Sequence, residues 1–385
     1  PEGMFYEAEN LKQVTIGPDV NDIGEFAFRD TKVDTYVVES GNKAYKAQSA
    51  DYILSADGKT LVAVSAVATD TYSQKNLGGA TVTAIAKGAF SHNMKLTAVE
   101  LPSVTAIGNY GLGSAESIEK VAFGVLTEIG EYAFFETSIT ELPKFAADAK
   151  IGKYAFAFTD LTSVTIPDGM TVAEGVFSQC MSLESVTIGN DVTLDKYAFN
   201  MDKDEAFDVH NYDENGEKYF YYDFSSALKE LTIGDNAVIG DNVFAGHARL
   251  EAVTLGAGAK LGYMAFYNCA SLKEIDLSKV VSIGDYALSG DVYYICLDEN
   301  MTVAAVSSEG TYIYTYHAQA IEKAELLAVT EIGEYAFAYC RDMTEVVLND
   351  AITELKPYTF AGCETLQVID LSKVITVGDY AFIEN

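Results

Sequence analysis

Ile129-Gly130-Glu131-Tyr132-Ala133-Phe134 decides the fold, because this six-residue phrase returns along the whole chain at a nearly constant interval. Most copies are 22 residues apart, with occasional steps of 21 or 23. A self-similar period of about 20 to 30 residues is typical of a solenoid, in which one short unit stacks on the next. The Phe position is occupied by Phe5, Phe28, Phe90, Leu112, Phe134, Phe156, Phe177, Phe199, Phe244, Phe266, Leu288, Phe337, Phe360 and Phe382.

One complete unit spans residues 161–177 and contains a short strand followed by a turn. In Leu161-Thr162-Ser163-Val164-Thr165-Ile166 apolar and polar residues alternate, which predicts a strand with its apolar side chains inward. Ser163 and Thr165 then face outward. Pro167-Asp168-Gly169 is a turn signal that ends the strand.

The second half of each unit carries the repeated phrase. An aliphatic residue five positions before the Phe forms a second inward row. The Gly that follows, such as Gly130, indicates either a positive φ or a closely approached backbone. The Tyr of the phrase, such as Tyr132, fits an amphipathic ring that shields the outer edge of the core. A row of such rings could alternatively stack against carbohydrate.

The units resemble those of the BspA-like (Treponema pallidum type) leucine-rich-repeat family of bacterial surface proteins. They follow the pattern Leu-x-x-Val-x-Ile, a loop, then Ile-Gly-x-Tyr-Ala-Phe-x-x-Cys, from residue 1 to residue 382. The resemblance implies an α/β-type, β-rich leucine-rich-repeat solenoid. This would be a right-handed superhelix of about 14 coils, with a parallel sheet on one face and turns or short 3-10 segments on the other. It also implies a secreted or cell-surface location and a role in adhesion.

Three insertions interrupt the period. The first contains Asp57-Gly58 and the third contains Asn215-Gly216, both of which are hairpin turn signals between alternating segments. The second, around 294–307, resembles the first position by position. We therefore predict one solenoid over 1–385 with three β-hairpin insertions, at about 39–80, 200–227 and 289–325.

Composition and charge narrow the function classes. With 49% apolar and 12% aromatic residues the chain can bury a continuous core. Acidic residues outnumber basic ones by 57 to 25, and the resulting net charge of −32 repels nucleic acid and anionic lipid. No apolar run reaches the ~18 residues that a membrane span needs, so we expect no membrane insertion in this fragment. Neither terminus has a polar cap or a signal segment, which suggests a fragment of a longer polypeptide or a trimmed mature form.

No pattern of metal-binding or catalytic residues stands out. The acidic segment 202–217 fails the EF-hand spacing, so a solvated loop is preferred over a calcium site. The four histidines, at 92, 210, 247 and 317, are isolated from one another, and no nucleophile elbow, phosphate loop or zinc motif occurs. We predict no metal, no cofactor and no enzyme activity. Hydrolysis of polysaccharide would need carboxylates that converge to ~5 to 10 Å in space.

Four of the five cysteines occupy one slot, three residues after the Phe position: Cys180, Cys269, Cys340 and Cys363. This shared placement indicates a buried packing position rather than a disulfide framework. Only Cys340 and Cys363 belong to adjacent coils, close enough for a disulfide to be considered. We expect free, buried thiols.

The strand face is the candidate binding surface. Thr165 and Thr187 are expected to be neighbours, as are Thr232 and Thr254, and such rows make a flat hydrogen-bonding surface of the kind that repeat proteins use for extended partners. Thr also simply suits an exposed strand. The candidate ligand-binding residues are Ser163, Thr165, Ser185, Thr187, Thr232, Thr254 and Asp276.

Two functions therefore remain open. The first is a protein-interaction or adhesion module that binds host or neighbouring-cell macromolecules through the strand face and the hairpins, with host extracellular matrix and other glycoproteins as candidate partners. The second is a structural spacer that presents another domain of a longer surface protein.

Overall fold

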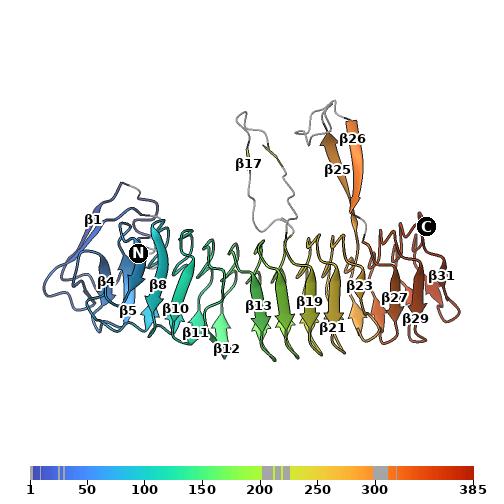
Figure 1. Cartoon of the computed structure of the whole chain (residues 1–385), viewed down its shortest axis with the longest axis horizontal. Helices are drawn as coiled ribbons and strands as arrows, with labels where there is room; N and C mark the ends of the chain where they lie inside the picture. The colour runs from blue at the N-terminus through green and yellow to red at the C-terminus, as the bar shows by residue number, and fades with distance from the viewer. Residues whose placement is uncertain are drawn as a thin grey trace. The chain divides into compact units, whose positions relative to one another are not determined.

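The computed structural model describes residues 3–8, 10–24, 27–28, 31–201, 211–212, 218–219, 226–297, 311–317 and 319–385. The chain divides into two compact units. The first unit comprises Pro1–Val164 and Val172–Leu183, and the second comprises Thr165–Thr171 and Glu184–Asn385. In each unit successive coils pair their strands in parallel (Figure 1), which confirms the predicted solenoid.

The first unit contains a strand ladder of order β10-β8-β6, a separate pair β1-β2, and a seven-stranded sheet of order β12-β11-β9-β7-β5-β4-β3. Its strands are β1 (Gln13–Ile16), β2 (Thr35–Val38), β3 (Tyr45–Lys46), β4 (Tyr52–Ser55), β5 (Thr60–Val64), β6 (Asp70–Ser73), β7 (Ala84–Ile85), β8 (Leu96–Leu101), β9 (Ala106–Ile107), β10 (Lys120–Phe123), β11 (Leu126–Ile129) and β12 (Phe145–Ile151). The division between the units falls at β13 (Ser163–Ile166) and β14 (Thr171–Val172).

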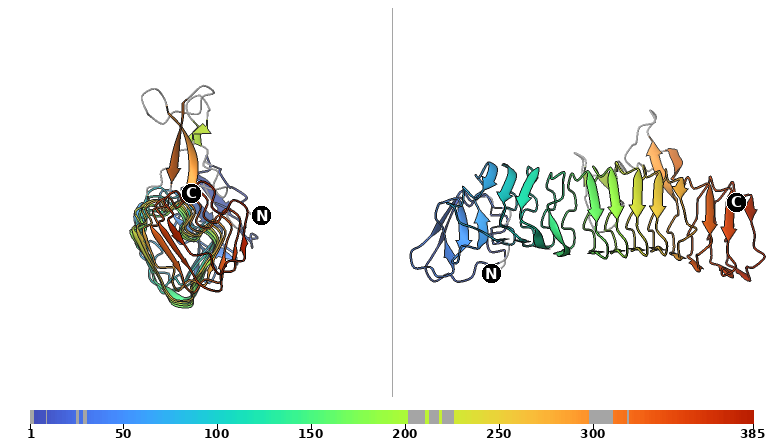
Figure 2. Two further views of the ribbon diagram at one scale, coloured as in Figure 1. Left: turned by 90° about the vertical axis from the view of Figure 1, so that its right-hand side faces the viewer. Right: turned by 60° about the horizontal axis from the view of Figure 1, so that its bottom comes forward.

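The second unit has two parallel ladders of the same kind, β15-β19-β21-β23 and β16-β20-β22-β24-β28, whose strands run side by side in Figures 1 and 2. The sheets β27-β29-β31 and β30-β32 continue the pattern. The strands are β15 (Ser185–Ile188), β16 (Thr193–Leu194), β17 (Asn211–Tyr212), β18 (Lys218–Tyr219), β19 (Glu230–Ile233), β20 (Val238–Ile239), β21 (Ala252–Leu255), β22 (Lys260–Leu261), β23 (Glu274–Ile275), β24 (Ser282–Ile283), β25 (Asp291–Leu297), β26 (Thr311–His317), β27 (Lys323–Leu326), β28 (Glu331–Ile332), β29 (Glu345–Leu348), β30 (Glu354–Leu355), β31 (Val368–Ile369) and β32 (Thr376–Val377).

Each coil has a third side, made of turns, which also bonds to the next coil. The N–H groups of Tyr132 and Phe134 donate to the carbonyls of Lys153 and Ala155, at 3.0 and 2.8 Å. The residues two before and two after the Phe position, here Tyr132 and Glu136, have φ of 57° and 54°, in the left-handed region. Because left-handed residues alternate with others in this turn, every second backbone N–H points toward the next coil. Of the expected turns or short 3-10 segments the structure has turns, and the described ranges contain no helix.

The repeated Gly is explained by close approach. A Cβ built on Gly130 would lie 2.4 Å from the backbone nitrogen of Asn109 in the preceding coil, and one on Gly152 would lie 2.5 Å from that of Glu131. Neither glycine has a positive φ. Of the two sequence explanations, the approached backbone is therefore the correct one at these positions, because any side chain would push the coils apart.

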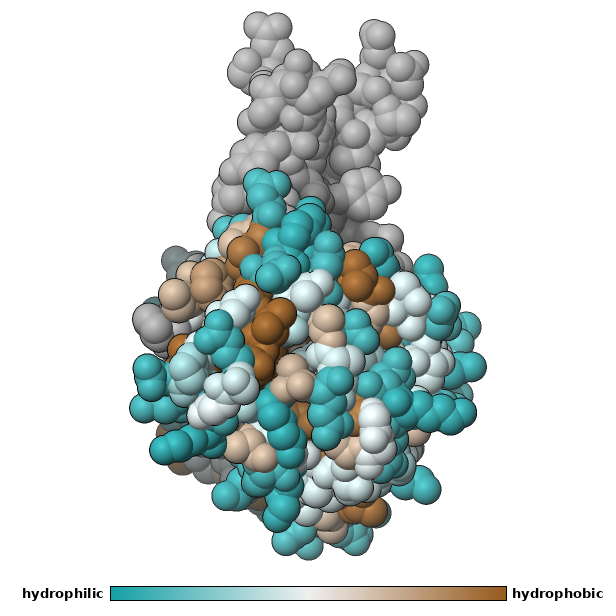
Figure 3. Space-filling model, turned by 90° about the vertical axis from the view of Figure 1, so that its left-hand side faces the viewer, coloured by the Kyte–Doolittle hydropathy of each residue, from teal (hydrophilic) through white to brown (hydrophobic). Residues whose placement is uncertain are grey.

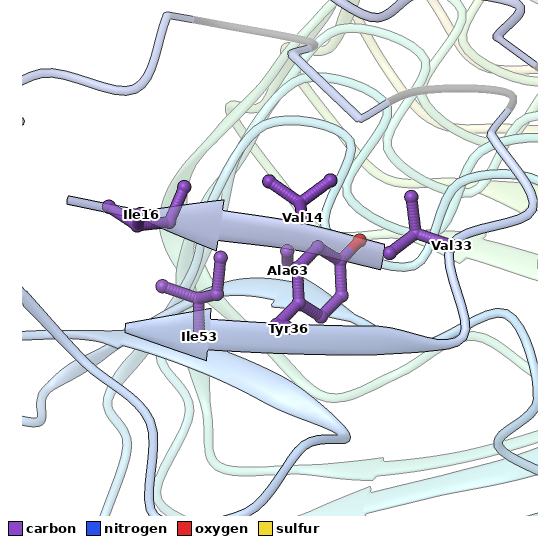
Figure 4. Packing of buried hydrophobic residues seen from close by; sticks show 6 residues of the cluster. All are labelled: Val14, Ile16, Val33, Tyr36, Ile53 and Ala63. Atoms are coloured by element: carbon purple, nitrogen blue, oxygen red, sulfur yellow. The ribbon is translucent and has the colours of Figure 1, made fainter. Parts of the chain in front are cut away.

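Apolar side chains from all three sides fill the interior. The rings at the Phe position stack from coil to coil, with centroids 4.9 Å apart for Phe134 and Phe156 and 5.4 Å apart for Phe244 and Phe266. In the first unit the stack is broken after Phe28, where the first insertion packs against the coils. Val14, Ile16, Val33, Tyr36, Ile53 and Ala63 form a buried cluster at this break (Figure 4).

The first insertion contains the antiparallel pair β4 and β5, as its hairpin signal predicted. In the second, β25 pairs antiparallel with β26, from Asp291 opposite His317 to Leu297 opposite Thr311. The expected second strand of this hairpin, within 302–307, lies outside the described residues. In the third, the short pair β17 and β18 is described, and the rest of 202–225 is not.

Candidate functional site

The strand face of the second unit carries a continuous row of threonines. Thr187 on β15 pairs with Thr232 on β19, which pairs with Thr254 on β21. All three side chains are exposed. The third insertion separates Thr187 from Thr232 in sequence and leaves their pairing intact, so the row is longer than the two separate pairs expected from the sequence.

The remaining candidate residues also face solvent. Ser163 and Thr165 on β13 and Ser185 on β15 are exposed. Asp276, just after β23, is exposed and accepts a 2.9 Å hydrogen bond from the Ser278 N–H. Hydrogen bonds from the Ser278 side chain and backbone lower the pKa of this carboxyl, so it is charged at neutral pH.

Charge is distributed unevenly over the same face. Glu230 lies in register with Ser185 and Ala252, and Ala252 in turn lies in register with Glu274, so two carboxylates border the threonine row. Further along, the Lys323 ammonium contacts Glu325 at 3.0 Å and Glu345 at 3.1 Å. These exposed contacts balance the lysine charge locally. The threonine row itself contains no charged side chain.

The opposite side of each unit carries stacked tyrosines. Tyr110, Tyr132 and Tyr154 stack in the first unit, with ring centroids 4.7 and 5.2 Å apart and interplanar angles of 10° and 15°. Both faces of an inner ring such as Tyr132 are covered by its neighbours. A sugar would therefore meet only ring edges, which makes carbohydrate stacking on these inner rings physically unfavourable.

The slot three residues after the Phe position holds buried hydrogen-bond donors. Cys180 Sγ donates to the Phe156 carbonyl at 3.1 Å, and Cys269 Sγ donates to the Phe244 carbonyl at 3.2 Å. Each sulfur satisfies a carbonyl of the preceding coil. All four cysteines of the slot are free and buried, as expected, and burial raises the pKa of the Cys180 thiol to about 11.

His247 occupies the same slot, a placement that sequence inspection missed because the histidine was treated as isolated. The signal was its spacing of three residues from Phe244. Its Nε2 lies 2.7 Å from the Phe199 carbonyl oxygen, and its Nδ1 lies 2.7 Å from Ser226 Oγ. The carbonyl requires Nε2 to carry the proton, so the Ser226 hydroxyl donates to Nδ1. Burial lowers the pKa of His247 to about 4, so the ring is neutral and acts as a structural clamp.

No metal site is assembled by the parts of the chain that the structure describes. Within them, no three His, Cys, Asp or Glu side chains lie together as metal ligands would. The acidic candidates of segment 202–217 lie outside the described residues. Nor does any helix in the described ranges have the length and apolarity of a membrane span.

The first unit contains a cavity of about 270 Å³ where the Phe stack is broken, lined by Ile23, Phe28, Val62 and Lys87 among others. Lys87 is the single charged residue among its described lining, so the cavity brings no pair of carboxylates together. Figure 3 shows one face of the molecule, on which apolar surface is exposed between polar side chains.

Comparisons with known proteins agree with this architecture. The profile of the family described as BspA type leucine-rich repeat region matches six copies, over residues 1–50, 83–205, 214–308 and 310–385. A search of curated protein sequences gave no significant match.

Solved structures with low similarity include a leucine-rich repeat protein from Bacteroides ovatus, at 18% identity and a TM-score of 0.40, covering 88% of this chain and 90% of that one. The pneumococcal vaccine antigen PcpA is 14% identical, with a TM-score of 0.42 and coverages of 89% and 86%. A leucine-rich cell surface protein from Faecalibacterium prausnitzii is 15% identical, with a TM-score of 0.33 and coverages of 87% and 86%. The assignment rests on the profile, which covers most of the sequence. The chain belongs to the BspA-type leucine-rich-repeat family.

Proposed function

We propose that this chain is a protein-interaction or adhesion module of a secreted or cell-surface protein, and that it binds its partner through the strand face. The observation that carries the proposal is the exposed, in-register row of Thr187, Thr232 and Thr254. Side chains fixed on neighbouring strands at ~4.8 Å spacing offer hydroxyl groups and methyl groups at no further cost in backbone entropy.

The partner that fits this surface is a protein or glycoprotein with an extended polar segment. Thr hydroxyls both donate and accept hydrogen bonds, so the row can satisfy the polar groups of a peptide or a glycan. Candidate partners include host extracellular matrix proteins and surface glycoproteins of neighbouring cells. The net charge of −32 disfavours nucleic acid and anionic membranes.

Asp276 extends the candidate surface. Asp276 adds an exposed carboxylate beyond the threonine row, which favours a partner with a basic group at that end. Electrostatic attraction of this kind affects the association rate more than the final affinity, and it is screened by salt.

An array of matrix proteins, plasma glycoproteins and glycans tests the proposal. The whole chain should bind at least one protein or glycoprotein, and the variant Thr187→Lys/Thr232→Lys/Thr254→Lys should lose that signal. A control, Asp241→Lys/Glu334→Lys, makes substitutions on the turn side and should keep it. No signal above a scrambled-surface control would reject the proposal and favour the structural spacer. Equal binding by all variants would reject the strand face as the site.

A further inference from the structure

The second unit contains a ladder of four tyrosines that the coil itself does not require. Tyr286, Tyr335, Tyr358 and Tyr380 stack with ring centroids 4.5, 4.4 and 5.2 Å apart and interplanar angles of 6°, 5° and 22°. Each has φ between 54° and 57°, a conformation that bulky residues rarely adopt. We call these four residues the tyrosine ladder.

Other residues serve equally well in this position of the coil. Gly175, Asn242 and Met264 occupy the same slot, two residues before the Phe position, with φ of 64°, 55° and 53°. The backbone therefore needs the left-handed conformation but not the phenol. What the tyrosines add is a line of close ring contacts, which needs a separate explanation.

The phenol groups of the ladder are close together and partly open to solvent. Tyr286, Tyr335 and Tyr358 are half-buried, and Tyr380 is 60% exposed. The Tyr335 ring lies between the nearly parallel rings of Tyr286 and Tyr358. Burial, followed by the neighbouring phenol of Tyr335, raises the pKa of Tyr286 to about 12, so this phenol remains protonated at neutral pH.

We propose that the tyrosine ladder is a site of oxidative cross-linking, where hydrogen peroxide and a haem peroxidase join adjacent rings as dityrosine. The peroxidase removes one electron and one proton from each of two neighbouring phenols. The two radicals then form a carbon–carbon bond between ring carbons ortho to the phenolic oxygens. Each of those carbons releases its hydrogen as a proton and each oxygen takes up a proton, which restores both aromatic phenols. Two tyrosines and one H₂O₂ thus give one dityrosine and two H₂O.

The geometry favours coupling within the molecule. Neighbouring rings among Tyr286, Tyr335 and Tyr358 are parallel to within 6° and their centroids are at most 4.5 Å apart, so ring carbons of neighbouring residues lie close together and only local ring rotation is needed. Thiols and indoles offer little competition for the oxidant among the described residues. The four cysteines of the repeat slot are buried with raised thiol pKa values, and the sequence has no Trp.

A cross-link here would join coils that are distant in sequence. Tyr286 and Tyr335 are 49 residues apart, and the second insertion lies between them. A bond between their rings would close that loop covalently and restrict the unfolded chain. Oxidation of the tyrosine ladder would thus make the solenoid more resistant to unfolding.

The test treats the whole chain, at dilution that suppresses intermolecular coupling, with H₂O₂ and a haem peroxidase. The expected result is dityrosine fluorescence, a loss of two hydrogens in mass for each link, and digestion products that join the Tyr335 peptide to the Tyr286 or Tyr358 peptide. The treated chain should also unfold at a higher temperature than the untreated chain.

Two variants make the test specific. Tyr335→Phe keeps the stacked ring and removes the phenol, so both Tyr335 links should be lost while the circular dichroism spectrum is unchanged. Tyr197→Phe alters a tyrosine of the same slot that lies next to Asn242 rather than another tyrosine, and should leave the links intact. The proposal is overturned if the untreated and treated chains give the same digest, or if the links map to tyrosines between 293 and 316 and persist in Tyr335→Phe.

Discussion

Gly256→Ala should destabilise the second unit although it adds a single methyl group. Gly256 follows β21, and a Cβ there would lie 2.3 Å from the Gly234 carbonyl carbon and 2.4 Å from the Asp235 nitrogen. Both are backbone atoms of the preceding coil and cannot rotate away. Since comfortable contact begins at 3.4 Å, the coils must separate locally by about 1 Å.

The cost can be worked from the contacts that this separation breaks. The Gly256 N–H donates to the Ile233 carbonyl at 2.8 Å, and an extra ångström takes the pair beyond hydrogen-bond distance. Overpacking costs about 1–3 kcal/mol and the lost hydrogen bond about 1 kcal/mol. We expect the free energy of unfolding to fall by about 2–4 kcal/mol.

Gly17→Ala is the matched control, because Gly17 follows β1 in the equivalent position. There, among the described residues, the only heavy atom within 4 Å of a new Cβ is Glu39 Oε2, at 3.9 Å, and φ is not positive. Ala should restrict the unfolded chain and stabilise by about 0.4–1 kcal/mol. Urea unfolding followed by circular dichroism measures both variants. Equal effects in the two positions, or no effect at Gly256, would refute the explanation by close approach.

Three further predictions follow from the buried slot and the stacked rings. Tyr335→Ala removes two ring contacts and should lower the free energy of unfolding by about 1–3 kcal/mol. Because φ is 54°, Tyr335→Gly should be about 1 kcal/mol more stable than Tyr335→Ala. If urea unfolding instead shows the Ala variant to be the more stable of the two, which is the usual order, this explanation is contradicted. His247 has a folded-state pKa of about 4, below its ordinary 6.5, so its stabilising effect is complete above pH 6.5 and is lost as the pH falls toward 4, by about 3 kcal/mol in total. His247→Gln should remove this part of the pH dependence in unfolding titrations, and identical profiles would count against a buried neutral ring. In a Cys296→Ser background the remaining thiols should resist an alkylating reagent at pH 8 until urea unfolds the chain, and rapid labelling of the folded form would show that the slot is open to solvent.

The repeat itself was predictable because every coil has the same interior to fill with apolar side chains. Spacing alone identified the Phe stack and the inward strand residues, and it identified the tight Gly position with two possible causes. It did not reveal the second parallel ladder, such as β16 with β20, because a two-residue strand shows no alternation. The left-handed Tyr residues were also missed, since bulky side chains ordinarily avoid positive φ and the coil-to-coil backbone hydrogen bonds that need this conformation cannot be seen in the sequence.

The candidate site was only partly predictable from sequence. The outward threonines follow from strand alternation, and their exposure agrees with it. The continuity from Thr187 to Thr232 could not be foreseen, because 45 residues of sequence separate them and only the pairing of β15 with β19 brings them together. The expectation of one solenoid over residues 1–385, and the role of the strand-face residues in binding, remain predictions.

The most direct test of the strand face is an affinity measurement by surface plasmon resonance against the strongest protein ligand from the array. We predict that Thr187→Lys/Thr232→Lys/Thr254→Lys raises Kd at least tenfold, a loss of about 1.4 kcal/mol in the free energy of binding. Asp241→Lys/Glu334→Lys on the turn side should leave Kd unchanged. The opposite pattern, with binding lost only in the turn-side variant, would contradict it.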